Sequence, residues 1–563
     1  MRFKQVSAVL AAILAFSFVS TACGGGNAVD TITTQPPASE SAVADGTPAS
    51  TEVTWEEAYT LDPATEGELT VMMWSGDDSF LQDVGHKEYA PEELFGQNGA
   101  AAYATAHEFN KIYPNIKINI FAMSGEPNKD GIPWAQHREN FAAEYGVYPD
   151  MYATTDVSGD ISKGLIADLS VYKEDPVYKT FNPSIMKMME YDGRQFALPQ
   201  YMIPWGIFIN KSLAEANNID IPEPNWNIDE YTEFTAHSEP EVYYGAMDSS
   251  QEVLRTATKG FVYSLINRSE SDPYVNFNTD EIKKMVDYAA QWVQDSIWPQ
   301  WDAHNISEEW MVGSGDWWGF NYFKNGKLLT LAGDPWMMGD CAHTDPNHWG
   351  RAQFDDWDIY PRPSSEWQPN HVGVVLDPFV IRNYAMDDGD PTLNDNEKKK
   401  LDIAWEFAKF WCADTRAWQA RADQQFSDGG NLKTSLNDSF PLVTGAEFDK
   451  QMAIWYGTPT HQRFADKELM PGFQYVLELW QDGNLWDVSS KSYPWFFDFE
   501  GSPRSIVYEW ENFRQPDVSG AMGTDANWAD QVKAHLADWN NQFNSRWAEA
   551  FVKVQEGLAK YYK

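Results

Sequence analysis

The chain has 563 residues, more than one hydrophobic core normally organises, so at least two domains or lobes are expected. Its 41 Lys and Arg residues stand against 84 Asp and Glu residues, for a net charge of −43. Such a surface repels phosphate backbones and anionic headgroups, which argues against a nucleic-acid partner. The 26 tryptophans exceed what core filling requires, and flat indole faces suit ligands with apolar faces and polar edges, such as sugars.

The first 22 residues have the pattern of a secretory signal peptide: two basic residues, an apolar run over 6–19 and small residues at 20–22. Cys23 follows directly and resembles the cysteine of a bacterial lipobox, although Ser20 stands where Leu is usual. We therefore expect an exported lipoprotein with a palmitate-type lipid anchor at Cys23, on the outer face of the plasma membrane. Ordinary secretion is the alternative. No other segment is apolar enough to span a bilayer.

Residues 24–66 are rich in Gly, Ala, Ser, Thr, Pro and acidic residues, which predicts a disordered tether. The first predicted strand covers 69–74 and runs into a polar turn that carries Asp77 and Asp78. A helix ending before Pro114 and an alternating strand over 116–120 follow. Strand, helix and strand in succession predict a parallel sheet.

Further along, residues 148–152 form a predicted short strand that ends near Asp156. Two extended pieces, 196–199 and 205–211, flank a loop that carries Trp205. The apolar run 328–332 predicts a buried strand ending at an exposed corner, 333–336, and a strand end of this kind is a common binding position. Near the C-terminus, apolar residues recur at helical spacing over 532–547 and predict a core helix.

Five stretches occur in the order found in a known family: FNKIYPNIKINI, YPDMYATTD, GLIADLSVY, DGRQFALPQYMIPWGIFINKSLAE and FKNGKLLTLAGDPW. The chain resembles the extracellular solute-binding proteins, family 1, of bacterial ABC importers, among them maltose-binding protein and its oligosaccharide-binding relatives. The resemblance implies an α/β fold of the two-lobed, periplasmic-binding-protein-like type (type II), with the ligand in the cleft between hinge-linked lobes. The expected divisions are 1–22 signal peptide; 23–66 lipidated cysteine and linker; 67–203 plus 373–435 lobe 1; and 204–372 plus 436–563 lobe 2.

A sugar site combines aromatic faces, which pack on C–H groups, with polar side chains that bind hydroxyls. At the position of Trp336 the family has a sugar-stacking tryptophan. Loops at the other predicted positions commonly face the cleft in the family. The candidate ligand residues are Trp74, Asp77, Asp78, Asp156, Trp205, Trp317, Asp334, Trp336 and Trp495.

The resemblance implies a monomeric receptor that captures a carbohydrate, with an oligosaccharide expected, by hinge closure and without a cofactor. It would present the sugar to the transmembrane subunits of an ABC permease, which works with a cytoplasmic ATPase. The alternatives are a secreted glycan-active hydrolase and a cell-surface carbohydrate-adhesion module. The adjacent carboxylates of Asp77 and Asp78 cannot be assigned the separation that glycoside hydrolysis needs, and the sequence has no nucleophile elbow, so we expect no enzyme.

The two cysteines of the mature chain, Cys341 and Cys412, raise the questions of a metal site and of a disulfide. Cys341 lies near His343, Asp345 and His348, but this spacing lacks a second matched ligand pair and argues weakly for zinc. A disulfide between Cys341 and Cys412 would join the two expected lobes and oppose closure. We therefore expect both thiols to be free, with Cys412 buried on a helical stripe.

Overall fold

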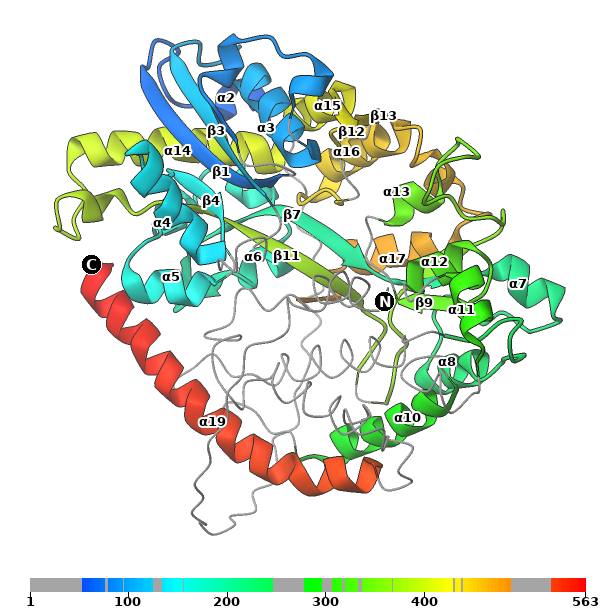
Figure 1. The fold of residues 1–563 in the computed structure, drawn as a ribbon. Helices are drawn as coiled ribbons and strands as arrows, with labels where there is room; N and C mark the ends of the chain where they lie inside the picture. The colour runs from blue at the N-terminus through cyan, green and yellow to red at the C-terminus, as the bar shows by residue number, and fades with distance from the viewer. Residues whose placement is uncertain are drawn as a thin grey trace, which may run out of the picture.

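The computed structural model describes residues 53–75, 79–94, 96–124, 134–154, 156–246, 278–295, 306–315, 319–332, 337–366, 368–428, 431–436, 439–487 and 528–562. Helices and strands alternate along this chain and gather around two separate sheets (Figure 1). The expected α/β class is therefore confirmed. Among the helices within these ranges, none is long and apolar enough to cross a membrane.

The first sheet has seven strands in the order β14-β11-β4-β1-β3-β2, with β7 also paired to β11. At its centre β1 is parallel to both β3 and β4, as the strand-helix-strand pattern predicts. The helices α3 (Gly96–Phe109) and α14 (Asp395–Ala413) pack against β1. The strands are β1 Gly67–Ser75, β2 Ser79–Leu81, β3 Ile116–Ser124, β4 Met151–Ala153, β7 Leu198–Trp205, β11 Val372–Ile381 and β14 Leu485–Asp487.

The second sheet is smaller and antiparallel, in the order β10-β8-β9. Its strands are β8 Ile207–Ile209, β9 Thr330–Ala332 and β10 Asp358–Tyr360. The helix α17 (Pro471–Gln481) packs against β10, and α12 (Gly319–Lys324) against β9. The strand expected before the corner at 333–336 is thus present as β9. Other helices on this side are α7 Lys211–Ala216, α8 Ile228–Thr235, α10 Asp280–Asp295, α11 Glu308–Ser314 and α13 Met337–Cys341.

A ribbon made of β7 and β11 joins the two sheets. β7 runs out of the first sheet and, after Gly206, continues as β8 of the second. β11 runs back antiparallel to it, with Gly373 opposite Trp205 and Val374 opposite Pro204. A Cβ at Gly206 would lie 2.4 Å from Ile359 Cγ2, so only glycine allows this close crossing. The chain thus crosses between the two sheets twice on this ribbon, once after β7 and once before β11.

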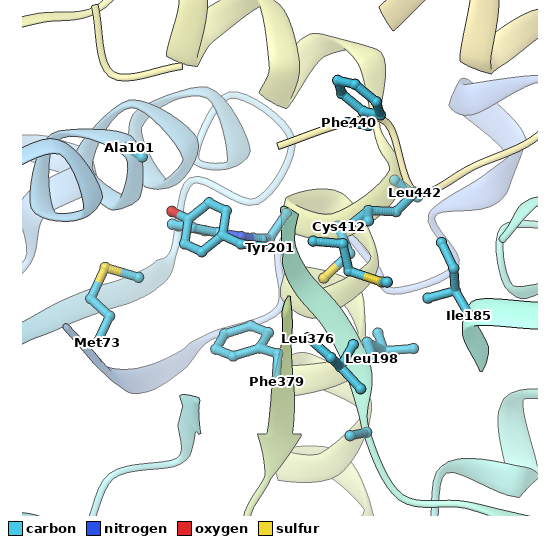
Figure 2. Packing of buried hydrophobic residues seen from close by; sticks show 14 of the residues in the cluster. Met73, Ala101, Ile185, Leu198, Tyr201, Leu376, Phe379, Cys412, Phe440 and Leu442 are labelled. Carbon is cyan, nitrogen blue, oxygen red and sulfur yellow. The ribbon is translucent and has the colours of Figure 1, made fainter. Parts of the chain in front are cut away.

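Part of the core lies where the ribbon meets the first sheet and α14. Figure 2 shows Tyr201 of β7, Leu376 and Phe379 of β11, and Cys412 of α14 among the buried side chains there. Cys412 is a free, buried thiol, and burial raises its pKa above the usual value. Cys341 is also buried and forms no disulfide with any described residue, so both expectations for the thiols are confirmed.

The segment before β1 is part of the folded domain. It forms the short helix α2 (Trp55–Ala58), in which Ala58 is buried. Lys409 Nζ donates to Ala58 O at 2.6 Å, and Trp55 Nε1 donates to Glu447 Oε2 at 3.1 Å. The linker expected to reach residue 66 is therefore shorter, because this segment carries enough large apolar side chains to dock despite its polar composition.

At the C-terminus α19 (Trp528–Tyr561) is a 34-residue helix, which confirms the helix expected over 532–547; Leu536 within it is buried. It contacts α5 (Val157–Lys163) beside the first sheet and α10 on the side of the second (Figure 1). The last described residues dock tightly, since Tyr562 OH donates to Ile166 O at 2.7 Å. One helix therefore spans the outside of both halves. The remaining elements are β5 Glu190–Tyr191, β6 Arg194–Gln195, α4 Trp134–Tyr145, α6 Pro183–Lys187, α15 Thr415–Asp423, β12 Gln425–Asp428, β13 Asn431–Thr434, α16 Gly445–Gly457 and the 3₁₀ turns.

Candidate functional site

Trp74 lies near the carboxyl end of β1, where the central parallel strands of the first sheet end. Its side chain is 47% exposed, which is unusual for a residue of this size. The preceding Met73 is buried in the core and fixes the strand. The indole is therefore held at the sheet edge with area free for a ligand, which is what its predicted stacking role requires.

Asp156 lies beyond the end of β4 and is the N-cap of α5. Its Oδ1 accepts hydrogen bonds from Gly159 N at 2.8 Å and from Ser158 Oγ at 3.0 Å. These bonds satisfy donors at the start of the helix. One carboxylate oxygen of this predicted ligand residue thus orders the helix, and Asp156 stays a prediction as a sugar contact.

A buried polar network behind this edge was not foreseen from the sequence. Arg138 of α4 donates to Asp160 Oδ1 at 3.2 Å and to Tyr152 OH at 2.8 Å, while Thr154 Oγ1 donates to Asp160 Oδ2 at 2.7 Å. Arg138 and Asp160 are both about nine-tenths buried. A paired network of this kind fixes the end of β4 and the start of α5. Nothing in the spacing of these residues predicts that they meet.

Trp205 ends β7 on the ribbon, and the structure brings it beside Arg362. The guanidinium carbon of Arg362 lies 5.8 Å from the centre of the Trp205 ring. Within the described part of the chain, the buried Nε1 of Trp205 has no hydrogen-bond partner. A buried donor without a partner is uncommon in folded proteins, and an oxygen-rich ligand would satisfy it. Trp205 is thus a half-buried aromatic with a polar group to offer, at the crossing between the sheets.

His371 is fully buried and forms an isolated β-bridge with Arg362. Its ring packs on Trp486, with 5.2 Å between the ring centroids. Its Nδ1 lies 3.3 Å from Pro369 O, so Nδ1 carries the proton and Nε2 is an acceptor. Burial, together with the smaller effect of the Arg362 charge, lowers the pKa of His371 to about 3. A neutral histidine and an arginine therefore lie beside the ribbon. No sequence motif marked either of them.

The other predicted ligand residues lie outside the described residues. They are Asp77, Asp78, Trp317, Asp334, Trp336 and Trp495, and the same holds for the lipidation candidate Cys23. The elements that lead into them are described: β1 ends just before 76–78, and β9 and α13 flank 333–336. These residues stay predictions.

No group of three or more His, Cys, Asp or Glu side chains that could hold a metal ion occurs in the ranges given above. Near Cys341, the rings of His343 and His348 instead stack on each other, 3.8 Å apart and 14° from parallel. Stacked imidazoles do not converge their nitrogens on one point, as a tetrahedral zinc site requires.

A surface groove of about 540 Å³ lies between α8 and α10. Tyr288 OH donates to Asp229 Oδ1 at 2.5 Å across it. None of the predicted ligand residues lines this groove, so we place the candidate site at the sheet edge and ribbon. Its lining residues are Asp229, Thr232, Glu233, Ala236, His237, Tyr288 and Gln291.

Two α/β halves joined by an antiparallel ribbon, with Trp205 at the crossing, define a two-lobed binding-protein fold of type II. The solved structures with this fold include an ABC substrate-binding protein from Listeria monocytogenes in complex with cycloalternan, at 15% identity and a TM-score of 0.52, covering 84% of this chain and 99% of that one. A periplasmic solute-binding protein from Pectobacterium atrosepticum is similar, at 12% identity, a TM-score of 0.52 and coverage of 85% and 99%. A sugar transporter protein from Rhizobium etli in an open conformation has 14% identity, a TM-score of 0.50 and coverage of 84% and 99%.

The chain therefore has the fold of ABC-transporter substrate-binding proteins over most of its length, and the expected fold type is confirmed. No protein-family model matches the sequence, and no curated protein matches it. At identities of 12–15% the likeness concerns the fold, so function has to be argued from this chain's own residues.

Proposed function

We propose that the protein is a lipid-anchored substrate-binding protein of an ABC importer, which captures an oligosaccharide and delivers it to the membrane permease. The observation that carries the proposal is a set of two tryptophans: Trp74, exposed at the edge of the first sheet, and Trp205, on the ribbon, whose buried N–H has no hydrogen-bond partner among the described residues. Indole faces and N–H donors suit a sugar, which offers C–H faces and hydroxyl oxygens.

The proposed mechanism is hinge closure on the β7–β11 ribbon. Lobe 1 would comprise 67–203 and 373–435, and lobe 2 204–372 and 436–563, so that the first boundary falls within β7 and the second near the start of β11. The ligand binds one lobe first, and contacts from the second stabilise the closed form. The permease then recognises that form, while the anchor at Cys23 keeps the receptor at the cell surface.

A glycan hydrolase is less well supported by the described residues. Hydrolysis needs two carboxyl groups free to flank the scissile bond. Asp156 is bonded to the first turn of α5, and Asp160 is paired with Arg138. Both carboxylates are engaged in holding the sheet edge, so neither is arranged as a free acid or nucleophile.

Calorimetric titration of the protein with linear oligosaccharides, followed by product analysis of each mixture, tests the proposal. We expect saturable binding without shortened products, and compaction on binding measured by X-ray scattering. Release of shortened sugars would favour the hydrolase, and binding without compaction would favour an adhesion module.

Single substitutions locate the site. Trp336→Ala should weaken binding while the empty protein melts at nearly the same temperature. Trp205→Ala should weaken binding with some loss of stability, because Trp205 is half-buried and contacts Arg362. Val171→Ala, a control that trims an apolar side chain 70% exposed elsewhere, should leave affinity unchanged. A large loss of stability in the Trp336 variant, with affinity intact, would assign that residue to the core.

A further inference from the structure

The loop after α13 presents a second exposed tryptophan that the sequence did not single out. Trp349 is 49% exposed, and besides Trp74 it is the only tryptophan among the exposed large apolar side chains of the described residues. Most exposed apolar residues need no explanation, but indole is the largest apolar surface a side chain can leave in water. The contacts of Trp349 show whether the orientation of its indole is fixed.

Contacts from α12 fix the position of Trp349. Lys324 Nζ donates to the backbone oxygen of Trp349, and the same ammonium lies 5.2 Å from the centre of the indole ring. The buried ring of Phe320 meets the indole edge-on, with 5.7 Å between centroids. A cation and an aromatic edge at these distances orient the indole without covering it. Trp349 is thus a preorganised aromatic face.

The two histidines of the same loop stiffen it. The Nδ1 atoms of His343 and His348 accept hydrogen bonds from Asp345 N at 3.1 Å and Gly350 N at 3.2 Å. Because a backbone N–H can only donate, each neutral ring carries its proton on Nε2. Burial lowers the pKa of both rings, that of His348 to about 4, so the stacked pair is neutral at pH 7. The loop that carries Trp349 therefore also carries two polar, uncharged imidazole rings.

The loop packs back onto α13, which follows β9 near the crossing. β9 ends at Ala332, opposite Ile207 of β8, and Ile207 is two residues beyond Trp205. Ala352 N donates to Cys341 O at 3.3 Å, and a Cβ at Gly350 would lie 2.7 Å from Asp340 Cβ. The residues around Trp349 are therefore held at the end of α13, the helix that follows β9.

We propose that Trp349 forms an outer stacking subsite for carbohydrate, contacting a sugar unit beyond those held at the ribbon. The inference rests on the proposed function and specifies its ligand: a chain long enough to reach from the ribbon to the α13 loop. A fixed, exposed indole face suits the C–H face of one sugar ring. Trp349 then sets a preference for longer oligosaccharides over disaccharides.

The test compares ligand lengths on one set of variants. Wild type, Trp349→Ala, Trp349→Phe and the control Val171→Ala are titrated calorimetrically with α-1,4-glucan, β-1,4-glucan and β-1,4-mannan oligosaccharides of two and six units. For the series that binds, Trp349→Ala should lower affinity for the hexasaccharide about 3- to 10-fold, the range of one aromatic contact, and leave the disaccharide unchanged. Trp349→Phe should restore most of that affinity, and all variants should melt at the wild-type temperature.

The outcomes separate this inference from the proposed function. If wild type binds the hexasaccharide and Trp349→Ala binds it equally well, Trp349 is no subsite, while the carbohydrate function stands. Equal losses for both ligand lengths would place Trp349 in the central site and also overturn the inference. If wild type binds no member of the panel, the proposed function fails and this inference fails with it.

Discussion

Replacing Lys409 by Met should loosen the N-terminal segment and destabilise the domain. Lys409 of α14 is fully buried, and its ammonium donates to Ala58 O at 2.6 Å and to Glu406 Oε1 and Asp175 Oδ2 at 3.0 Å each. Met fills a similar volume without the charge. The substitution therefore strands two carboxylates and frees the carbonyl at the end of α2.

The expected loss of unfolding free energy is about 3–5 kcal/mol, the usual effect of removing one partner of a buried ion pair. Glu406 is 2% exposed and keeps donors from Thr60 and Tyr113. Burial already raises its pKa, and the Lys409 charge opposes that rise, so without Lys409 the carboxyl takes up a proton more readily. The double variant Lys409→Met/Glu406→Gln removes one stranded charge and should recover part of the loss.

Urea unfolding followed by tryptophan fluorescence measures this effect, and chymotrypsin cleavage at Trp55 and Tyr59 reports release of the segment. Lys398→Met is the matched control: it lies on the same helix, pairs with Asp402 at 2.8 Å, and its side chain is 62% exposed. An exposed pair contributes about 0–1 kcal/mol. If Lys409→Met costs no more than this control and leaves the segment equally protected, the buried ammonium does not hold the segment in place.

Three further outcomes follow from the packing. Gly557→Ala would put a Cβ 2.6 Å from Ser162 Cα, so it should reduce the free energy of unfolding by about 1–3 kcal/mol and lower the melting temperature. Gly457→Ala is the control, because its Cβ would meet no atom within 4 Å and should have no effect. Equal effects of the two substitutions would refute the close contact of α19 and α5. Burial raises the pKa of Asp358 to about 6, so the native state binds more protons than the unfolded state between about pH 4 and 6. In urea unfolding, the stability of wild type relative to Asp358→Asn should therefore fall by about 2–3 kcal/mol from pH 4 to 7. A difference that stays constant with pH would contradict this prediction. Cys412 should react with a thiol reagent only after unfolding; rapid reaction in buffer would contradict its burial.

Local patterns were enough to predict the central strands of the first sheet and β9. Their apolar runs end at turn residues, and such runs are buried wherever the sheet forms. The docking of the N-terminal segment escaped prediction because it depends on Lys409 and Glu406, about 350 residues away along the chain. Arg362 and His371 form a bridge in the segment between β10 and β11, and no sequence motif marks that pairing. Charge and composition predict neither contact.

The same limit applies to the candidate site. Trp205 could be proposed from its loop, but the sequence could not show that its N–H is buried without a hydrogen-bond partner among the described residues. Trp349 lay in a stretch first weighed as a weak metal motif, because histidine and cysteine in sequence suggest ligands before stacking is known. In the fold the two histidines pack on each other, and the tryptophan beside them is exposed.

The two ends of α19 determine how the proposed closure can proceed. At its C-terminal end, Gly557 touches the backbone of α5, and Tyr562 donates to Ile166 O and accepts from Arg194 through its own carbonyl. On the side of α10, Lys533 pairs with Asp287, whose side chain is 59% exposed. Backbone contacts without space for a Cβ cannot slide, whereas a solvent-exposed ion pair contributes little and re-forms easily. Hinge closure should therefore carry α19 with the first sheet and shift its contact with α10, which would transfer this helix from the proposed lobe 2 to lobe 1.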